Sequence, residues 1–158
     1  MLKKLRILAF IPMLLMMFVI WGFSANNGET SSTQSMGIVM RVVNFADRMT
    51  GEKMTTEEKL VWENRIHTPI RKLAHMTEYM IFACTVAFPF LLYDKKKKWI
   101  TMVTFFCCTC YATMDEIHQL FVPNRSGQFK DVCIDAVGIL IGIFMFRLFY
   151  GATHSSEI

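Results

Sequence analysis

The sequence predicts an all-α, polytopic membrane protein, a single domain over residues 1–158 with four transmembrane helices and a helical extracytoplasmic insert. Hydrophobic residues make up 53% of the chain, which is high for an ordinary soluble domain of this length. They gather in four runs. Lys and Arg exceed Asp and Glu by 17 to 13, and the excess lies in short stretches beside those runs. This distribution is typical of membrane topology signals and argues against nucleic-acid binding.

The first run, residues 7–23, carries no charged side chain and follows Lys3, Lys4 and Arg6. It is either an uncleaved signal anchor or a cleaved signal peptide. Because it is longer than the apolar region of about 7 to 15 residues in a cleaved signal, we expect an anchor that forms the first span.

The other three runs predict spans at residues 70–93, 99–119 and 132–150. The second span should begin at Thr68 and Pro69, because Thr is a favourable N-cap and Pro fits the first helical position. Each of these runs has an uncharged stretch slightly shorter than the roughly 20 residues that cross a bilayer. Their polar ends should therefore lie at membrane depth or just above it.

The short basic segments predict the orientation, since Lys and Arg beside a span are retained in the cytoplasm. With the basic N-terminus inside, four crossings return the loop 94–98 to the inside and leave both termini cytoplasmic. Residues 24–68 and 120–130 are then extracytoplasmic. We expect a multi-pass membrane protein whose first partner is the lipid bilayer.

The segment 24–68 contains two helical patterns. Apolar residues recur at helical spacing over 38–49, which favours a helix on the membrane surface or across the mouth of the bundle. Thr55 and Glu58 have the spacing of a capping box, which predicts a second short helix to about Arg65. The alternative for both is a solvated loop.

Three groups of polar side chains reach the outer end of the bundle in this topology. On the second predicted helix Arg71, His75 and Glu78 share one face by their i, i+4 and i+7 spacing. The third and fourth helices and the turn between them bring further acids, bases and a guanidinium. The candidate catalytic residues are His75, Glu78, Asp115, Glu116, His118, Gln119, Asp131 and Asp135, and the candidate anion-binding residues are Arg71, Lys72 and Arg125.

Such groups cost several kcal/mol each in hydrocarbon unless they are paired or hydrated, so they should face the bundle interior. We expect one layer with a cavity open to the outside, at least one Arg–carboxylate contact and at least one His–carboxylate contact within hydrogen-bonding distance. Gly138 and Gly142 follow Asp135 on the same stripe and form a GxxxG pattern, which permits close helix packing.

Three interpretations of the cluster remain open: an ion-pair network that only fixes the helices, a catalytic site, and a site for a divalent metal. The metal interpretation is the weakest, because the spacing matches no dedicated motif such as HExxH. The cysteines have neither a secreted framework spacing nor paired CxxC motifs, so we interpret them as small helix residues. They are Cys84, Cys107, Cys108, Cys110 and Cys133.

The polar motifs resemble those of the VanZ-like family, named after a bacterial protein associated with resistance to teicoplanin. The resemblance rests on residues 71–79, 115–127, Asp131, 135–138 and Gly142. A departure is Asn124, which stands where the family usually has Gly. The resemblance implies a multi-pass bacterial membrane protein involved in lipoglycopeptide resistance or envelope physiology, and it supplies no reaction.

The leading functional hypothesis is an outward-facing site that acts on a lipid head group or a lipid-linked cell-wall intermediate. In this scheme His75 and His118 are acid and base, and Asp115, Asp131 and Asp135 orient them or bind a metal. A second hypothesis is a non-catalytic protein that modulates access of an antibiotic or a partner to the surface, which would depend on residues 38–49. A proton-coupled transporter is the third, although four short spans show no repeated pair of broken helices.

Overall fold

The computed structural model describes residues 6–51, 54–93 and 95–154, and every regular element within these ranges is helical. Lys3, Lys4 and Asp94, which served the topology prediction, lie outside the described residues. The elements are α2 (Ile11–Ala25), α3 (Gly28–Thr50), α4 (Thr56–Leu91), α5 (Lys97–Gln119) and α6 (Phe129–His154). An all-helical fold was predicted and is confirmed.

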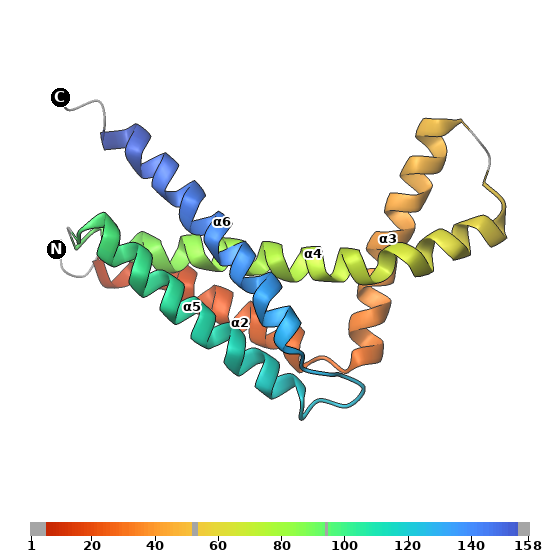
Figure 1. The fold of residues 1–158 in the computed structure, drawn as a ribbon, viewed down its shortest axis with the longest axis horizontal. Helices are drawn as coiled ribbons and strands as arrows, with labels where there is room; N and C mark the ends of the chain where they lie inside the picture. The colour runs from red at the N-terminus through yellow and green to blue at the C-terminus, as the bar shows by residue number, and fades with distance from the viewer. Residues whose placement is uncertain (1–5, 52–53, 94, 155–158) are drawn as a thin grey trace.

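Four of these helices form a bundle in which α4 packs most extensively against α6 (Figure 1). The α3 helix leaves the bundle and pairs with the first half of α4, so that the two form a projecting hairpin (Figure 1). The beginning of α2 and the end of α6 lie at the same end of the bundle as the α4–α5 connection (Figure 1). The α5–α6 connection and the α2–α3 junction lie at the opposite end, where the polar residues were predicted.

Three helices are long and apolar enough to cross a membrane: Arg6–Ala25, α4 and the Phe129–Tyr150 part of α6. The α5 helix covers the predicted third span but does not reach this standard. Its first turn holds Lys97 and Lys98 and its last turns hold four polar site residues, which leaves a short apolar middle. The count of four spans therefore stays a prediction.

The predicted helix start at Thr68 and Pro69 is wrong, whereas the bounds of the second span within the membrane stay a prediction. The short helix predicted from Thr55 and the span predicted over 70–93 are one continuous helix, α4. Pro69 lies inside it, although an internal proline lacks one helical hydrogen bond and its ring crowds the preceding turn. The capping box is confirmed: Glu58 N donates to Thr55 Oγ1 (3.3 Å) and Thr55 N donates to Glu58 Oε2 (2.8 Å).

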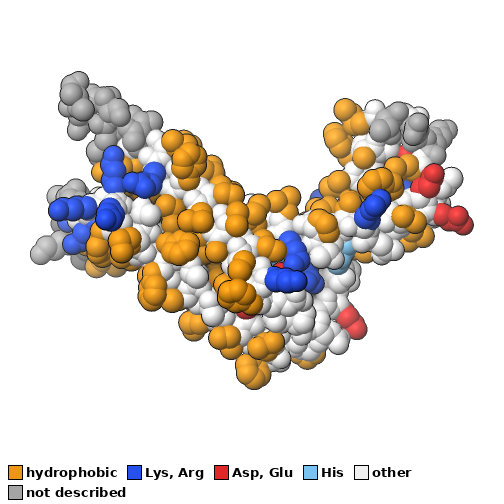
Figure 2. Space-filling view, viewed as in Figure 1, with side chains coloured by type: hydrophobic (Ala, Val, Ile, Leu, Met, Phe, Trp, Pro, Cys, Tyr) orange, Lys and Arg blue, Asp and Glu red, His pale blue; other side chains and the backbone are white. Residues whose placement is uncertain are grey.

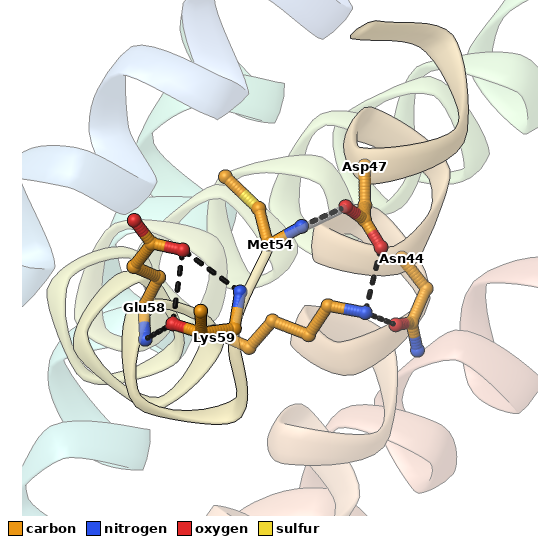
Figure 3. A network of polar contacts seen from close by, with 6 residues as sticks. Asn44, Asp47, Met54, Glu58 and Lys59 are labelled. Carbon is orange, nitrogen blue, oxygen red and sulfur yellow. Dashed lines mark hydrogen bonds and ion pairs between the residues drawn. The ribbon is translucent and has the colours of Figure 1, made fainter. Parts of the chain in front are cut away.

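The helix predicted over residues 38–49 is confirmed within α3, which begins earlier, at Gly28, behind an Asn27 cap. The solvated-loop alternative is therefore wrong for this segment. A polar network joins the ends of the hairpin (Figure 3). Asp47 accepts from Lys59 Nζ at 2.6 Å and from Met54 N at 2.8 Å. The helix's place on the membrane surface stays a prediction.

The core of the bundle is apolar. Large hydrophobic side chains also cover its outer face (Figure 2), including Phe18, Phe106 and Phe144 on three different helices. A soluble bundle would bury such residues, whereas a membrane solvates them. The buried core residues are Ile20, Tyr79, Phe82, Ala83, Val86, Cys108, Ala112, Ile139 and Ile143.

The predicted close packing at the GxxxG pattern is confirmed. A Cβ atom at Gly138 would overlap the backbone carbonyl of Met76, and one at Gly142 would overlap that of Met80. The α6 backbone therefore lies directly against the α4 backbone. This contact holds Asp135, one turn earlier on α6, against the polar face of α4.

Candidate functional site

A cavity of about 60 Å³ lies where α4, α5, α6 and the α5–α6 connection meet. Most of the polar residues predicted from the sequence line it, although they come from four separate stretches of chain. They are Arg71, Lys72 and His75 of α4, Glu116 and Gln119 of α5, Arg125 of the connection, and Asp131 and Asp135 of α6. The structure therefore brings these predicted residues together, while their roles stay predictions.

The charge pairs of this cavity differ from those predicted. Lys72 Nζ forms an ion pair with Asp131 Oδ1 at 2.8 Å. His75 Nδ1 lies 3.7 Å from Glu78 Oε2, which is an ion-pair distance but exceeds hydrogen-bonding distance. No arginine of the cluster, which is described in full, pairs with a carboxylate. The predicted Arg–carboxylate contact is therefore wrong, and the His–carboxylate contact is looser than predicted.

Arg125 instead binds the end of α2. Its Nη2 donates to the carbonyl of Phe23 at 2.8 Å and its Nε to that of Asn26 at 3.0 Å. The last carbonyls of a helix lack intrahelical donors, so a cation there makes strong hydrogen bonds. Burial lowers the pKa of the Arg125 guanidinium below its usual value, but an arginine remains charged. Two of its donors thus serve the fold.

The turn before Arg125 explains the departure from the family pattern. Asn124 has φ of 58°, a left-handed conformation that glycine adopts most easily and asparagine tolerates best among the other residues. Its carbonyl lies where a Cβ atom of Gly28 would be, so the turn packs against the start of α3. Asparagine is therefore compatible with this left-handed turn.

Two carboxylates at the centre of the cluster are almost completely buried. Asp115 and Asp135 are each 2% exposed, and each has one oxygen, Oδ1, that accepts no hydrogen bond from the protein. The other oxygen of Asp115 accepts from Gln119 Nε2 at 3.1 Å. Buried carboxylates are costly unless their oxygens are satisfied. Asp135 lines the cavity, so its free oxygen is a candidate acceptor for a ligand or for water, whereas Asp115 does not line it.

Glu116 has a different task. Its Oε2 accepts from the backbone N–H of Gln128 at 2.8 Å. A Cβ atom at Gly127 would overlap the Glu116 carbonyl, so the connection folds tightly onto the end of α5. Glu116 therefore both lines the cavity and fixes its rim.

His118, predicted as an acid or base, lines neither this cavity nor the second cavity described below. Its ring packs against Trp21 of α2 with the ring centroids 4.1 Å apart, and its Nδ1 lacks a hydrogen-bond partner. Rotation of α5 relative to α2 sets this placement, and the sequence contains no signal for it. His75 is the imidazole that reaches the cavity.

A second cavity, of about 150 Å³, lies between the end of α2, α3 and α4. Its walls share Arg71, His75 and Arg125 with the first cavity. Glu78 lines the second cavity and not the first. The sequence predicted one cavity, whereas the structure has two that meet at these cationic and imidazole side chains.

The sequence analysis missed a polar joint between α3 and α4. His67 Nε2 lies 2.8 Å from Ser35 Oγ, 3.4 Å from Ser32 Oγ and 3.3 Å from the Ser32 carbonyl. Ser35 Oγ also donates to the Ser31 carbonyl at 2.9 Å. These contacts join the middle of α3 to α4. The spacing of His67, four residues before Arg71, could have found it.

The part of the chain that is described contains no set of ligands for a metal ion. No group of three or more His, Cys, Asp or Glu side chains there is arranged to hold an ion. The cavity instead combines cations with carboxylates, and it has one imidazole. Such a set can bind an anion and can move a proton.

The model of the protein family described as VanZ/LLP1 matches residues 9–150. The matched range contains α2, α3, α4 and α5 in full and α6 up to residue 150. No curated protein and no solved structure matches the chain. The resemblance that the motifs indicated is confirmed.

Proposed function

The chain belongs to the VanZ/LLP1 family of membrane proteins, and on this premise we propose that its polar cavity binds the phosphate-bearing head group of a membrane lipid or of a lipid-linked cell-wall intermediate. The observation that carries the proposal is the convergence of Arg71, Lys72, His75 and Arg125 on one cavity at one end of the bundle. Guanidinium groups match the geometry of phosphate oxygens, which makes arginine the preferred ligand for such groups.

Arg71 is the principal anion ligand in this proposal. Lys72 is neutralised by Asp131, and Arg125 uses two donors on the carbonyls of α2. Arg71 forms no ion pair with any described carboxylate, and it lines both cavities. Among the cations of the cluster, Arg71 is therefore the one whose charge is compensated least by groups of the protein.

His75 is the proposed acid or base. It lies beside Glu78 and lines both cavities, so a head group bound at Arg71 would lie within its reach. An imidazole changes charge near neutral pH and transfers protons readily. Asp135 would orient the head group through its free oxygen.

The proposal requires that the cavity face outward. We propose four crossings, cytoplasmic termini and an extracytoplasmic α5–α6 connection, in a bacterial cell membrane. Reporter domains fused after residue 154 and inserted within 120–128 would test this. A reporter that is active only in the cytoplasm should respond at the first position, and a reporter that is active only outside the membrane should respond at the second. Reporters active on the same side would contradict the topology.

The function is tested by comparing lipids and cell-wall precursors in cells with and without the protein. We expect a specific head-group change that is lost in Arg71→Gln and His75→Gln. Lys59→Gln, a cation of the projecting hairpin, is the matched control and should behave as wild type. If conservative changes of His75, Asp115 and Arg71 all preserve the cellular effect in folded protein, the site has no such function.

A second function is favoured by the hairpin of α3 and α4. It projects from the bundle (Figure 1) and exposes Val42, Phe45 and Met49 on α3, none of which lines either polar cavity. Such a surface could lie in the bilayer interface and alter how an amphiphilic antibiotic such as teicoplanin reaches its target. Replacing these three side chains by Ser while keeping His75 separates the functions: resistance would fall here, whereas head-group chemistry would persist.

A further inference from the structure

We infer that the ligand of this site is an amphiphile, whose anionic group lies in the first cavity and whose hydrocarbon chain begins in the second. The inference rests on the proposed function and goes beyond it by assigning the hydrocarbon chain of the phosphate-bearing lipid to the second cavity.

The two cavities lie on either side of the same three residues. Arg71, His75 and Arg125 line both, so a molecule that occupies one cavity is in contact with the boundary of the other. The first cavity continues from there to the charged residues of α5 and α6. The second continues in the other direction, between α2, α3 and α4.

The second cavity has mainly apolar walls beyond this boundary. Phe23 of α2, Ile38 of α3, and Ile70 and Ala74 of α4 line it, and its remaining residues on α3 are uncharged. Hydrocarbon surface is stabilised there by about 25 cal/mol for each Å² removed from water. A free phosphate ion gains nothing from these walls, whereas a lipid gains from both cavities.

Glu78 is the one carboxylate of the second cavity. It faces His75, and its Oε2 accepts no hydrogen bond from the protein. A hydroxyl group of a lipid head group can donate to this oxygen, whereas a bare phosphate dianion would be repelled by it. Glu78 and Arg71 line the same cavity, which fits a ligand that carries a phosphate and a hydroxyl or glycerol unit near it.

Size restricts how much of the lipid is enclosed. Cavities of about 60 and 150 Å³ are small beside the ~300–1,000 Å³ of typical small-molecule pockets, so only the region around the phosphate fits inside. Phe23 and Ile38 are also partly exposed, at 43% and 50%. The chain can therefore pass over them from the cavity into the surrounding bilayer.

The test is binding to the purified full-length protein in detergent micelles, measured by native mass spectrometry. The probes are inorganic phosphate, a dibutanoyl phosphatidylglycerol and a dioleoyl phosphatidylglycerol, with dioleoylglycerol as the uncharged reference. Affinities are compared as variant-to-wild-type ratios, because partitioning of a lipid into the micelle cancels in that ratio.

Ala74→Trp fills the second cavity from α4, and Ile38→Asp places a charge in it from α3. Each should weaken dioleoyl phosphatidylglycerol about tenfold or more and leave the dibutanoyl lipid unchanged, and a tenfold change is about 1.4 kcal/mol. Arg71→Gln should weaken both lipids. Ala46→Trp is the matched control, because it fills an apolar cavity of the hairpin whose lining residues carry no charge.

The outcomes separate the two proposals. If both cavity variants bind the dioleoyl lipid as wild type does, or if inorganic phosphate competes as well as the lipid, the amphiphile inference is overturned and the anion site remains. If no phosphate probe binds better than dioleoylglycerol, or if Arg71→Gln changes nothing, the proposed function fails. Equal weakening by Ala46→Trp would assign the effect to general loss of packing and would overturn the inference.

Discussion

The charged residues of the hairpin and those of the cavity show opposite relations between burial and pairing. In the hairpin, Asp47 and Lys59 are partly exposed and form an ion pair at 2.6 Å (Figure 3). In the polar cluster, Asp115 and Asp135 are almost fully buried, yet each keeps an oxygen that accepts no hydrogen bond from the protein.

This difference separates residues that serve the fold from candidates for function. An exposed ion pair requires little desolvation and contributes little to the free energy of unfolding. A buried carboxylate with a free acceptor costs several kcal/mol, and apolar residues of similar volume would pack there more favourably. The retention of two such groups beside Arg71 and His75 is expected of a binding site and not of a structural network.

The largest effect is expected for the substitution Asp135→Leu. The variant should lose lipid binding or its cellular effect completely, because it removes the free acceptor at the centre of the cavity. Its stability should stay the same or rise, by ~1–4 kcal/mol in comparable buried-charge replacements. Thermal unfolding in detergent and the binding assay measure the two effects. A variant that unfolds but retains activity when stabilised would show that Asp135 is structural.

The second test concerns the helix contact that holds Asp135 in place. Gly138→Ala places a methyl group against the Met76 carbonyl, and overpacking of this kind costs roughly 1–3 kcal/mol. Gly22→Ala on α2 is the matched control, since nothing lies within 4 Å of its new Cβ atom. It should be neutral or stabilising, because alanine is the better helix former by about 1 kcal/mol. Equal melting temperatures for the two variants would contradict the close packing.

Arg125 tests whether a charge of the cavity can serve the fold instead. Arg125→Gln removes the guanidinium bonds to Phe23 and Asn26 and should destabilise the protein by about 1–2 kcal/mol, because the half-buried carbonyls regain some water. Arg71→Gln, the matched arginine without such bonds, should leave stability unchanged and reduce binding. Identical stability of the two variants would contradict the structural role assigned to Arg125.

The smallest effect is expected in the hairpin. Hydrogen bonds from Lys59 and from Met54 N lower the pKa of the Asp47 carboxyl below its usual 3.8. The stability that this group contributes is therefore fully present above that value and is lost as the pH falls through the lower pKa of the folded state. Asp47→Asn should lower the unfolding temperature slightly at neutral pH and should match wild type in strong acid. A difference that grows on acidification would contradict this assignment.

Much of the fold followed from local patterns. The periodicity of residues 38–49 predicted part of α3, the Thr55 capping box predicted the start of a helix, and Gly138 with Gly142 predicted close packing. These signals depend on residues within about one or two helical turns, where the geometry of the chain fixes relative positions. The continuation of α4 through Pro69 did not follow, because a proline is a frequent helix start and its tolerance inside a helix depends on contacts elsewhere.

Within the candidate site, the sequence by itself determined which polar side chains share a helix face and the end of the bundle that they reach. Only the tertiary structure decided their partners. Arg125 binds carbonyls that lie 99 and 102 positions earlier in the chain, and His118 turns to Trp21 instead of the cavity. Helical periodicity reaches only along one element, whereas these contacts depend on the rotation and separation of different helices, which the packing of the whole bundle sets.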